Sequence, residues 1–314
     1  MPRLQVTEKH PENGDRLRNV RSVLLRGPLA SQIDWTDVQR EATLDEMCAV
    51  HDRAYLEGVR SDSATGKRYG ASTVLPPGGW LAISLAAGAA LDATDSVLSG
   101  ASAPLCGSRA CALHVRLTRA QHAGRHRTGK ACIAYCLIRP PGHHASRQNC
   151  DGYCFVNAAA LCAQRAVERG HRVAVIDFDV HHGNGTQAIF YGRSDVLCVS
   201  MHADQGPWEE GTAHPETGAV DEVGIGDGIG HTLNVPLDMG SGDAAHIAAF
   251  EAIIAPAVAD FKPTFIVVAC GVDGSQMDPN GALLQAQQLG ACSYMRGRDA
   301  LSARMTTYAQ ADSC

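Results

Sequence analysis

The chain has 314 residues, of which 45% are hydrophobic, and a formal net charge of −6. This length and apolar content suit one large α/β domain, and the dispersed Lys and Arg residues argue against direct nucleic-acid binding. The 12 cysteines include no Cys-x-x-Cys pair and are too sparse for a disulfide scaffold, which argues against a thiolate zinc site and favours an intracellular, reducing compartment, cytoplasmic or nuclear.

No membrane segment is predicted. The N-terminus lacks the apolar core of a signal peptide. The most apolar long stretch, Trp80 to Leu91, is too short to cross a bilayer and is followed by Asp92. We therefore expect no membrane association, and the composition leaves homo-oligomer formation open.

Two helices are predicted first along the chain. The pattern from Thr43 to Glu57 is amphipathic; Thr43 and Glu46 fit a capping box at its start, and Gly58 fits its end. An Ala-rich helix is predicted from Trp80 to Leu98, ending before Gly100.

Strands and helices then alternate. The predicted strands are short apolar runs, at Ile133–Ile138, Val173–Phe178, Val196–Met201 and Thr264–Cys270. The helices between and beside them are predicted at Asn157–Arg169, which Gly170 ends, and from an N-cap at Asp243 to Asp260. This alternation predicts an α/β fold with an open, mostly parallel sheet and helices on both faces.

Residues 102–130 break the alternation. They include Cys106, Cys111 and three histidines together with six Arg or Lys, and show little apolar periodicity. They could form a basic flap over a substrate or a Cys/His metal site, although the spacings match no familiar zinc pattern. Long structureless loops are uncommon in compact domains. We therefore predict a surface insertion that takes no part in the chemistry.

The polar residues that follow two of the strands predict a metal site. Asp179 and His181 are two positions apart at a strand end, so both side chains can point the same way. Asp273 follows another strand and can supply a third ligand. Two carboxylates and one imidazole suit zinc, with iron(II) or cobalt as alternatives. Taken alone, Asp179 would more simply be a capping residue.

Histidines beside this site suit proton transfer. His143 and His144 follow a stiff Pro-Pro-Gly segment, and an imidazole next to a metal-bound water is a natural general base or acid. Each needs an acceptor on its far nitrogen. We predict Asp177 for His143 and Asn184 for His144. His182 is predicted to be a structural hydrogen-bonding residue.

With these residues the chain resembles zinc-dependent deacetylases of the histone deacetylase and acetylpolyamine amidohydrolase family. Asn184, where some branches have Asp, is similar to the class II and bacterial branch. The matching segments, in family order, are His10–Glu12 with Arg16-Leu17, Arg139–His144, Gly152–Asn157, Asp177–Gln187, Val199–His202 and Gly271–Asp273.

The resemblance implies hydrolysis of the amide bond of an acetylated amine by metal-activated water. The substrate would be acetyl-lysine of a histone or other protein, or an acetylpolyamine. It also implies an arginase/deacetylase-like fold, with residues 1–314 forming one catalytic domain.

The resemblance also assigns the site residues. Zinc would bind Asp179, His181 and Asp273, while His143 and His144 transfer protons with Asp177 and Asn184 behind them. Gly152, Tyr153 and His214 would line the substrate tunnel, with His214 replacing an aromatic residue that is frequent in the family. A structural potassium would bind Asp177, Ser200 and Met201, together with oxygens of Asp179 and His181.

The sequence departs from the family pattern at both ends. An opening strand and a loop beside the active site are expected to be missing, as is the C-terminal part of the fold. Residues 282–314 resemble nothing in the family and contain no Gly-Gly-Tyr segment, whose tyrosine would donate a hydrogen bond to the substrate carbonyl. Tyr308 lies at a comparable distance but lacks the glycines. A frameshift or alternative splice would produce such a tail.

Three interpretations follow from these patterns. The chain is an active amidohydrolase, a catalytically impaired family member that still binds metal, or a different metallohydrolase of arginase-like architecture.

Overall fold

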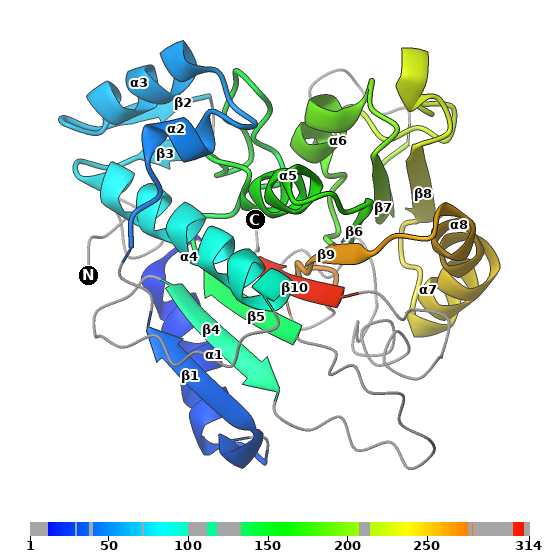
Figure 1. Cartoon of the computed structure of the whole chain (residues 1–314), viewed down its shortest axis with the longest axis horizontal. Helices are drawn as coiled ribbons and strands as arrows, with labels where there is room; N and C mark the ends of the chain where they lie inside the picture. The colour runs from blue at the N-terminus through cyan, green and yellow to red at the C-terminus, as the bar shows by residue number, and fades with distance from the viewer. Residues whose placement is uncertain are drawn as a thin grey trace.

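The computed structural model describes the backbone of 32–34, 36, 37, 112–117, 133 and 304–310 and, more fully, residues 12–28, 30, 31, 35, 40–70, 72–99, 134–206, 214–275 and 278. An eight-stranded sheet runs through this part of the chain (Figure 1). In spatial order its strands are β1 (Ile33–Asp37), β4 (Ala112–Leu117), β5 (Ile133–Ile138), β10 (Arg304–Gln310), β9 (Phe265–Ala269), β6 (Val173–Asp177), β7 (Val196–Asp204) and β8 (Thr232–Asp238).

All pairings from β5 to β8 are parallel, whereas β1–β4 and β4–β5 are antiparallel. The predicted open, mostly parallel sheet is therefore confirmed. The helices are α1 (Gly14–Arg26), α2 (Leu44–Met47), α3 (Arg53–Asp62), α4 (Gly79–Ser99), α5 (Ala158–Glu168), α6 (Asn184–Phe190), α7 (Asp243–Ala249) and α8 (Ala255–Phe261), with a π-helical segment, Phe250–Ile254, joining the last two. A small hairpin consists of β2 (Lys67–Tyr69) and β3 (Thr73–Leu75).

The sheet separates two apolar cores because successive strand residues point to opposite faces. In β6, Val175 packs into the core beneath α4 and α5, whereas Ile176 packs into the core beneath α7 and α8. In β9, Val267 and Val268 divide in the same way. Central strands buried on both faces therefore read as continuous apolar runs, as predicted.

Helix α4 crosses the larger core and contacts α5 and β5 (Figure 1). Its small alanines let the two helices approach closely, and all residues from Ala82 to Leu91 are buried. Gly79–Ser99 and Asp243–Phe261 are long and apolar enough to cross a membrane by length and composition alone. The first is mostly buried, and a core helix of a soluble protein passes the same test.

The prediction of one continuous helix from Thr43 to Glu57 is wrong, because two shorter helices occupy this stretch. The capping box of Thr43 and Glu46 is present, but α2 ends at Met47 and α3 starts at Arg53. Between them, the backbone amide of Asp52 donates to the carbonyl of Arg147 at 2.9 Å, a bond that it could not form inside a continuous helix. Gly58 lies inside α3, since one glycine costs a helix only about 1 kcal/mol.

Two predicted non-family stretches contribute strands. Residues 112–117, inside the proposed insertion at 102–130, form β4 between β1 and β5. Residues 304–310, inside the proposed tail at 282–314, form β10 between β5 and β9. The described parts of both stretches therefore belong to the sheet. Residues 101–111, 118–132 and 279–303 lie outside the described part of the chain.

Candidate active site

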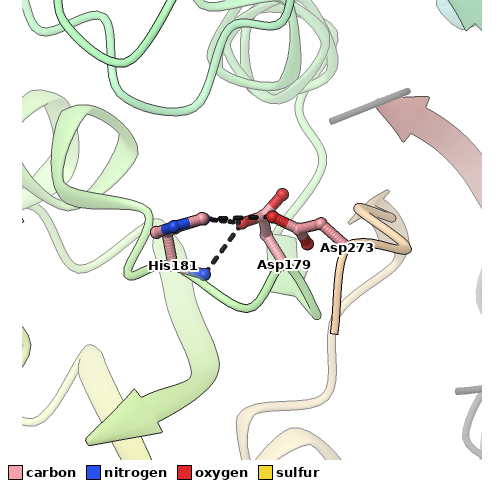
Figure 2. A group of neighbouring side chains, drawn as sticks. All are labelled: Asp179, His181 and Asp273. Carbon is pink, nitrogen blue, oxygen red and sulfur yellow. Dashed lines mark hydrogen bonds and ion pairs between the residues drawn. The ribbon is translucent and has the colours of Figure 1, made fainter. Parts of the chain in front are cut away.

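Three buried side chains meet where β6 and β9 end. Nδ1 of His181 lies 3.1 Å from Oδ1 of Asp179 and 3.0 Å from Oδ2 of Asp273. Figure 2 shows these side chains pointing toward one another from two separate loops. One ligand atom from each lies within 4.8 Å of the others, and none of the residues is more than 5% exposed. The structure thus brings together the three residues predicted as metal ligands.

Backbone hydrogen bonds fix the two carboxylates. Oδ1 of Asp179 accepts a hydrogen bond from the amide of His181 at 2.8 Å, and Oδ1 of Asp273 accepts one from the amide of Val180 at 3.0 Å. Gly271 makes room for this arrangement, because a Cβ there would lie 1.9 Å from Oδ2 of Asp179. The absence of a side chain at Gly271 therefore leaves space for the carboxylate of Asp179.

The chemistry of this donor set fits a divalent cation. Burial and the neighbouring charge of Asp179 raise the pKa of Asp273 to about 6, which shows how unfavourable two buried carboxylates are together. A cation between them would offset that repulsion. Two carboxylates and an imidazole are the ligand types that zinc and related metals bind, with positions left for water and substrate.

Two further histidines lie beside this cluster, each with an oriented ring. Nδ1 of His143 lies 2.9 Å from Oδ2 of Asp177, and Nδ1 of His144 lies 2.8 Å from Oδ1 of Asn184. The two ring centroids are 3.9 Å apart, and Nε2 of His143 is 3.8 Å from Oδ1 of Asp179. Because each Nδ1 faces an oxygen, the orientation of each ring is fixed.

The two imidazoles have opposite proton affinities. Burial acts to lower the pKa of His143, but the charges of Asp177 and Asp179 outweigh it, so that pKa is raised. Burial and the neighbouring His143 hold the pKa of His144 well below its usual range. Such a divergence is typical of paired acid and base groups.

Long-range contacts hold the segment that carries these histidines. Arg139, which starts the Arg-Pro-Pro-Gly-His-His segment, is buried and forms an ion pair with the buried carboxylate of Glu12. His51 is buried as well: its Nδ1 lies 2.8 Å from the carbonyl oxygen of Ser146, and its Nε2 accepts a hydrogen bond from the amide of Asn157 at 2.9 Å. The sequence offered no local signal for either contact.

The residues predicted to line a substrate tunnel also gather here. A Cβ at Gly152 would lie 2.2 Å from Cδ2 of His144, so this position needs glycine. Tyr153 is buried, and its amide donates to Oγ1 of Thr73 at 3.0 Å. The ring of His214 lies 4.8 Å from that of His144 and 6.0 Å from that of His181.

The backbone of His214 is fixed by one side chain. The side-chain oxygen of Gln205 accepts a hydrogen bond from the backbone amide of His214 at 3.0 Å, and its side-chain nitrogen donates one to the backbone carbonyl of His214 at 2.7 Å. Nδ1 of the imidazole lies 3.9 Å from a carboxylate oxygen of Asp151. This clamp, which the sequence did not reveal, holds a polar ring against the site.

A second layer of polar residues lies behind the metal ligands. His182 is hydrogen-bonded to Thr217 and Gln187, which agrees with the structural role predicted for it. Asp177 and Ser200 are partners in the parallel pairing of β6 and β7, and both line a small cavity. The side chain of Met201 is buried in the apolar core, so only its backbone carbonyl is available to a cation.

Comparison with known proteins decides the family. Residues 10–301 match the histone deacetylase domain. The chain belongs to the histone deacetylase family. It is 40% identical over 282 residues to histone deacetylase 8 of Arabidopsis thaliana, a match that covers 88% of this chain and 66% of that protein. It is 35% identical over 273 residues to a histone deacetylase-like amidohydrolase of Pseudomonas aeruginosa, covering 86% and 62%.

Solved structures agree with this family and its fold. The crystal structure of the HDA15 HD domain matches with a TM-score of 0.79 and 29% identity, covering 98% of this chain and 78% of that one. Acetylpolyamine aminohydrolase from Burkholderia pseudomallei matches with a TM-score of 0.72, 24% identity and coverages of 99% and 89%, which supports the fold alone. The predicted arginase/deacetylase-like fold is therefore confirmed, and an unrelated metallohydrolase is excluded. The chain spans slightly less than two thirds of the length of these two curated relatives.

Proposed function

We propose that this chain hydrolyses the amide bond of an acetylated amine, with zinc held by Asp179, His181 and Asp273. The observation that carries the proposal is the juxtaposition of this buried ligand cluster with two imidazoles whose Nδ1 atoms face fixed oxygens. Family membership supports the same reaction class. Iron(II) or cobalt suits the same donor set.

The chain's own residues would bind and orient the reactants. Bound zinc supplies Lewis acidity, which activates water and polarises the substrate carbonyl. His144 is the proposed general base, because Asn184 occupies its Nδ1 and leaves Nε2 to accept the proton of the attacking water. His143, held by Asp177, is the proposed partner that stabilises charge and returns a proton to the leaving amine. Asp177 and Asn184 act by fixing ring orientation.

The substrate is proposed to approach past Gly152, Tyr153 and His214. Its class would be acetyl-lysine of a histone or other protein, or a small acetylated amine such as an acetylpolyamine. Relatives named as histone deacetylases and as an amidohydrolase support both choices. We also propose an intracellular, reducing location, which suits the seven cysteines of the described residues, since none of these is in a disulfide.

A monovalent cation, potassium, is proposed behind the zinc ligands. Its ligands would be side-chain oxygens of Asp177, Asp179 and Ser200 and the backbone carbonyls of Asp179, His181 and Met201. The buried, adjacent positions of Asp177 and Ser200 support this site. Its role would be to stabilise the strand ends that carry the zinc ligands.

Turnover of an acetyl-lysine peptide and of an acetylated polyamine by the zinc-reconstituted chain tests the proposal. We expect hydrolysis that His144→Ala abolishes, whereas His231→Ala, at a partly exposed imidazole away from the site, leaves it unchanged. Equal rates in the wild type and His144→Ala would contradict the assignment.

A catalytically impaired member is the second candidate, because the sequence contains no Gly-Gly-Tyr segment. The backbone of Tyr308 lies in β10, opposite Cys136 and Ala269 of the neighbouring strands. Losing one preorganised donor to the substrate oxygen typically costs ~10²–10³ in turnover. Zinc binding with rates lower by that factor supports impairment, whereas family-like rates that survive Tyr308→Phe refute it.

A further inference from the structure

The direction of one buried hydrogen bond is determined by its neighbours. His202 lies on β7, two residues after Ser200, and is 3% exposed. Its Nε2 lies 3.1 Å from the carbonyl oxygen of Gly218, and its Nδ1 lies 2.9 Å from Oγ of Ser200. A carbonyl oxygen only accepts, so a neutral imidazole carries its hydrogen on Nε2. Nδ1 is then an acceptor, and the Ser200 hydroxyl donates to it.

The surroundings hold this arrangement in place. The ring of His202 is buried and lies 4.8 Å from the ring of His182, so a positive charge on it would be unfavourable on both counts. Oε1 of Glu222 accepts a hydrogen bond from the amide of Ala219 at 3.2 Å and thereby fixes the Gly218–Ala219 peptide, whose carbonyl faces Nε2. Gly218 has a φ of +105°, and a Cβ there would lie 2.5 Å from Nε2, so glycine brings the carbonyl against the ring.

The orientation of the Ser200 hydroxyl determines what its oxygen can offer to its other neighbours. With its hydrogen directed at His202, Oγ offers only lone pairs elsewhere, and the amide of Gly183 approaches one of them at 3.4 Å. Asp177 is the parallel-strand partner of Ser200 and lines the same small cavity. Two buried acceptors, a carboxylate and an oriented hydroxyl oxygen, then face a common space, which favours a cation.

We propose that His202 is a positioning residue for the monovalent cation. Its Nδ1 accepts the hydrogen bond of the Ser200 hydroxyl and so directs the lone pairs of Oγ toward the cation. The inference rests on the potassium site of the proposed function and adds a residue to it. Without the acceptor at Nδ1, the Ser200 hydroxyl is free to donate to Asp177. That hydrogen bond would use a lone pair of the Asp177 carboxylate and would place the hydroxyl hydrogen in the space that the cation needs.

The test is a double-mutant cycle read by cation-dependent stability. The thermal midpoint of wild type, His202→Leu, Ser200→Ala and the double variant is measured as potassium replaces tetramethylammonium at constant ionic strength. A ligand that binds only the folded state raises the midpoint with concentration, which gives its affinity. We expect His202→Leu to weaken potassium binding about tenfold, the typical worth of one hydrogen bond, and to have no further effect when Ser200 is alanine.

Two measurements keep the result decisive if His202→Leu fails to fold. His202→Asn places an amide oxygen near the position of Nδ1 and should retain most of the affinity. The ¹⁵N shifts of the His202 ring in the unmodified chain, assigned by the signal that this variant removes, should report hydrogen on Nε2. A proton on Nδ1, or an equal loss of affinity with and without Ser200, overturns the inference.

A wild type that shows no potassium-dependent shift overturns both the cation site and the role of His202. Because the readout is stability and not turnover, that result is distinct from a failure of the proposed hydrolysis.

Discussion

His51 should make the stability of this chain depend on pH, and replacing it should remove that dependence. Its buried ring bridges the carbonyl of Ser146 and the amide of Asn157, which belong to the two segments that carry His144 and Tyr153. Burial lowers the pKa of His51 from 6.5 to about 4. Between these two pH values, His51 is therefore neutral in the folded chain and protonated in the unfolded chain.

The sign and size follow from this difference. The contribution of neutral His51 to the free energy of unfolding is complete above pH 6.5. It is lost as the pH falls toward 4, because in that range His51 binds a proton in the unfolded chain but not in the folded chain. At about 1.4 kcal/mol per pH unit, the depression amounts to about 3 kcal/mol, of which about 2 kcal/mol falls between pH 7 and pH 5.

The variant His51→Phe keeps an aromatic ring but cannot titrate. At pH 7 it should be less stable by about 1–3 kcal/mol for each of the two backbone groups left without a partner. Urea unfolding of the wild type and the variant at pH 7, 6 and 5 should show this difference in the free energy of unfolding narrowing by about 2 kcal/mol. A gap that stays constant from pH 7 to pH 5 would refute the reasoning.

Three further predictions follow. Asp177→Asn should lower turnover about 10–100-fold, because it removes the carboxylate charge that raises the pKa of His143, while the zinc content stays the same; unchanged kcat would contradict that role. Gly271→Ala should reduce the zinc content measured by elemental analysis, since the added Cβ would displace the carboxylate of Asp179, and full zinc occupancy would be the contrary result. Trypsin should cleave at Arg116 more slowly than at the exposed Arg147, which lies outside the helices and strands, because β4 pairs on both sides; early cleavage at Arg116 would argue against that pairing.

The central strands were predictable because a strand buried on both faces must be apolar throughout. Val173–Asp177 and Phe265–Ala269 are such runs, and their polar residues begin where the strands end. Strand β8 was missed because Asn234 and Pro236 interrupt its apolar pattern, a pattern that an edge position tolerates. Strand β4 has Leu113, Val115 and Leu117 at alternate positions, a period-two signal that the surrounding basic residues obscured.

The candidate site was predictable where its geometry is local. Asp179 and His181 are two residues apart, and the carboxyl ends of parallel strands bring Asp273 beside them. The supporting contacts were not predictable, because they join residues far apart in the sequence. Arg139 and Glu12 are 127 positions apart, and His51 and Asn157 are 106 apart. Only the fold makes them neighbours.

The metal content of the purified chain tests the central claim most directly. After incubation with zinc and removal of excess metal, elemental analysis should give one tightly bound zinc per chain. Asp179→Asn and Asp273→Asn should each lose most of it, and Asp238→Asn, at an exposed carboxylate on β8, should retain it. Stoichiometric zinc in both ligand variants would contradict the account.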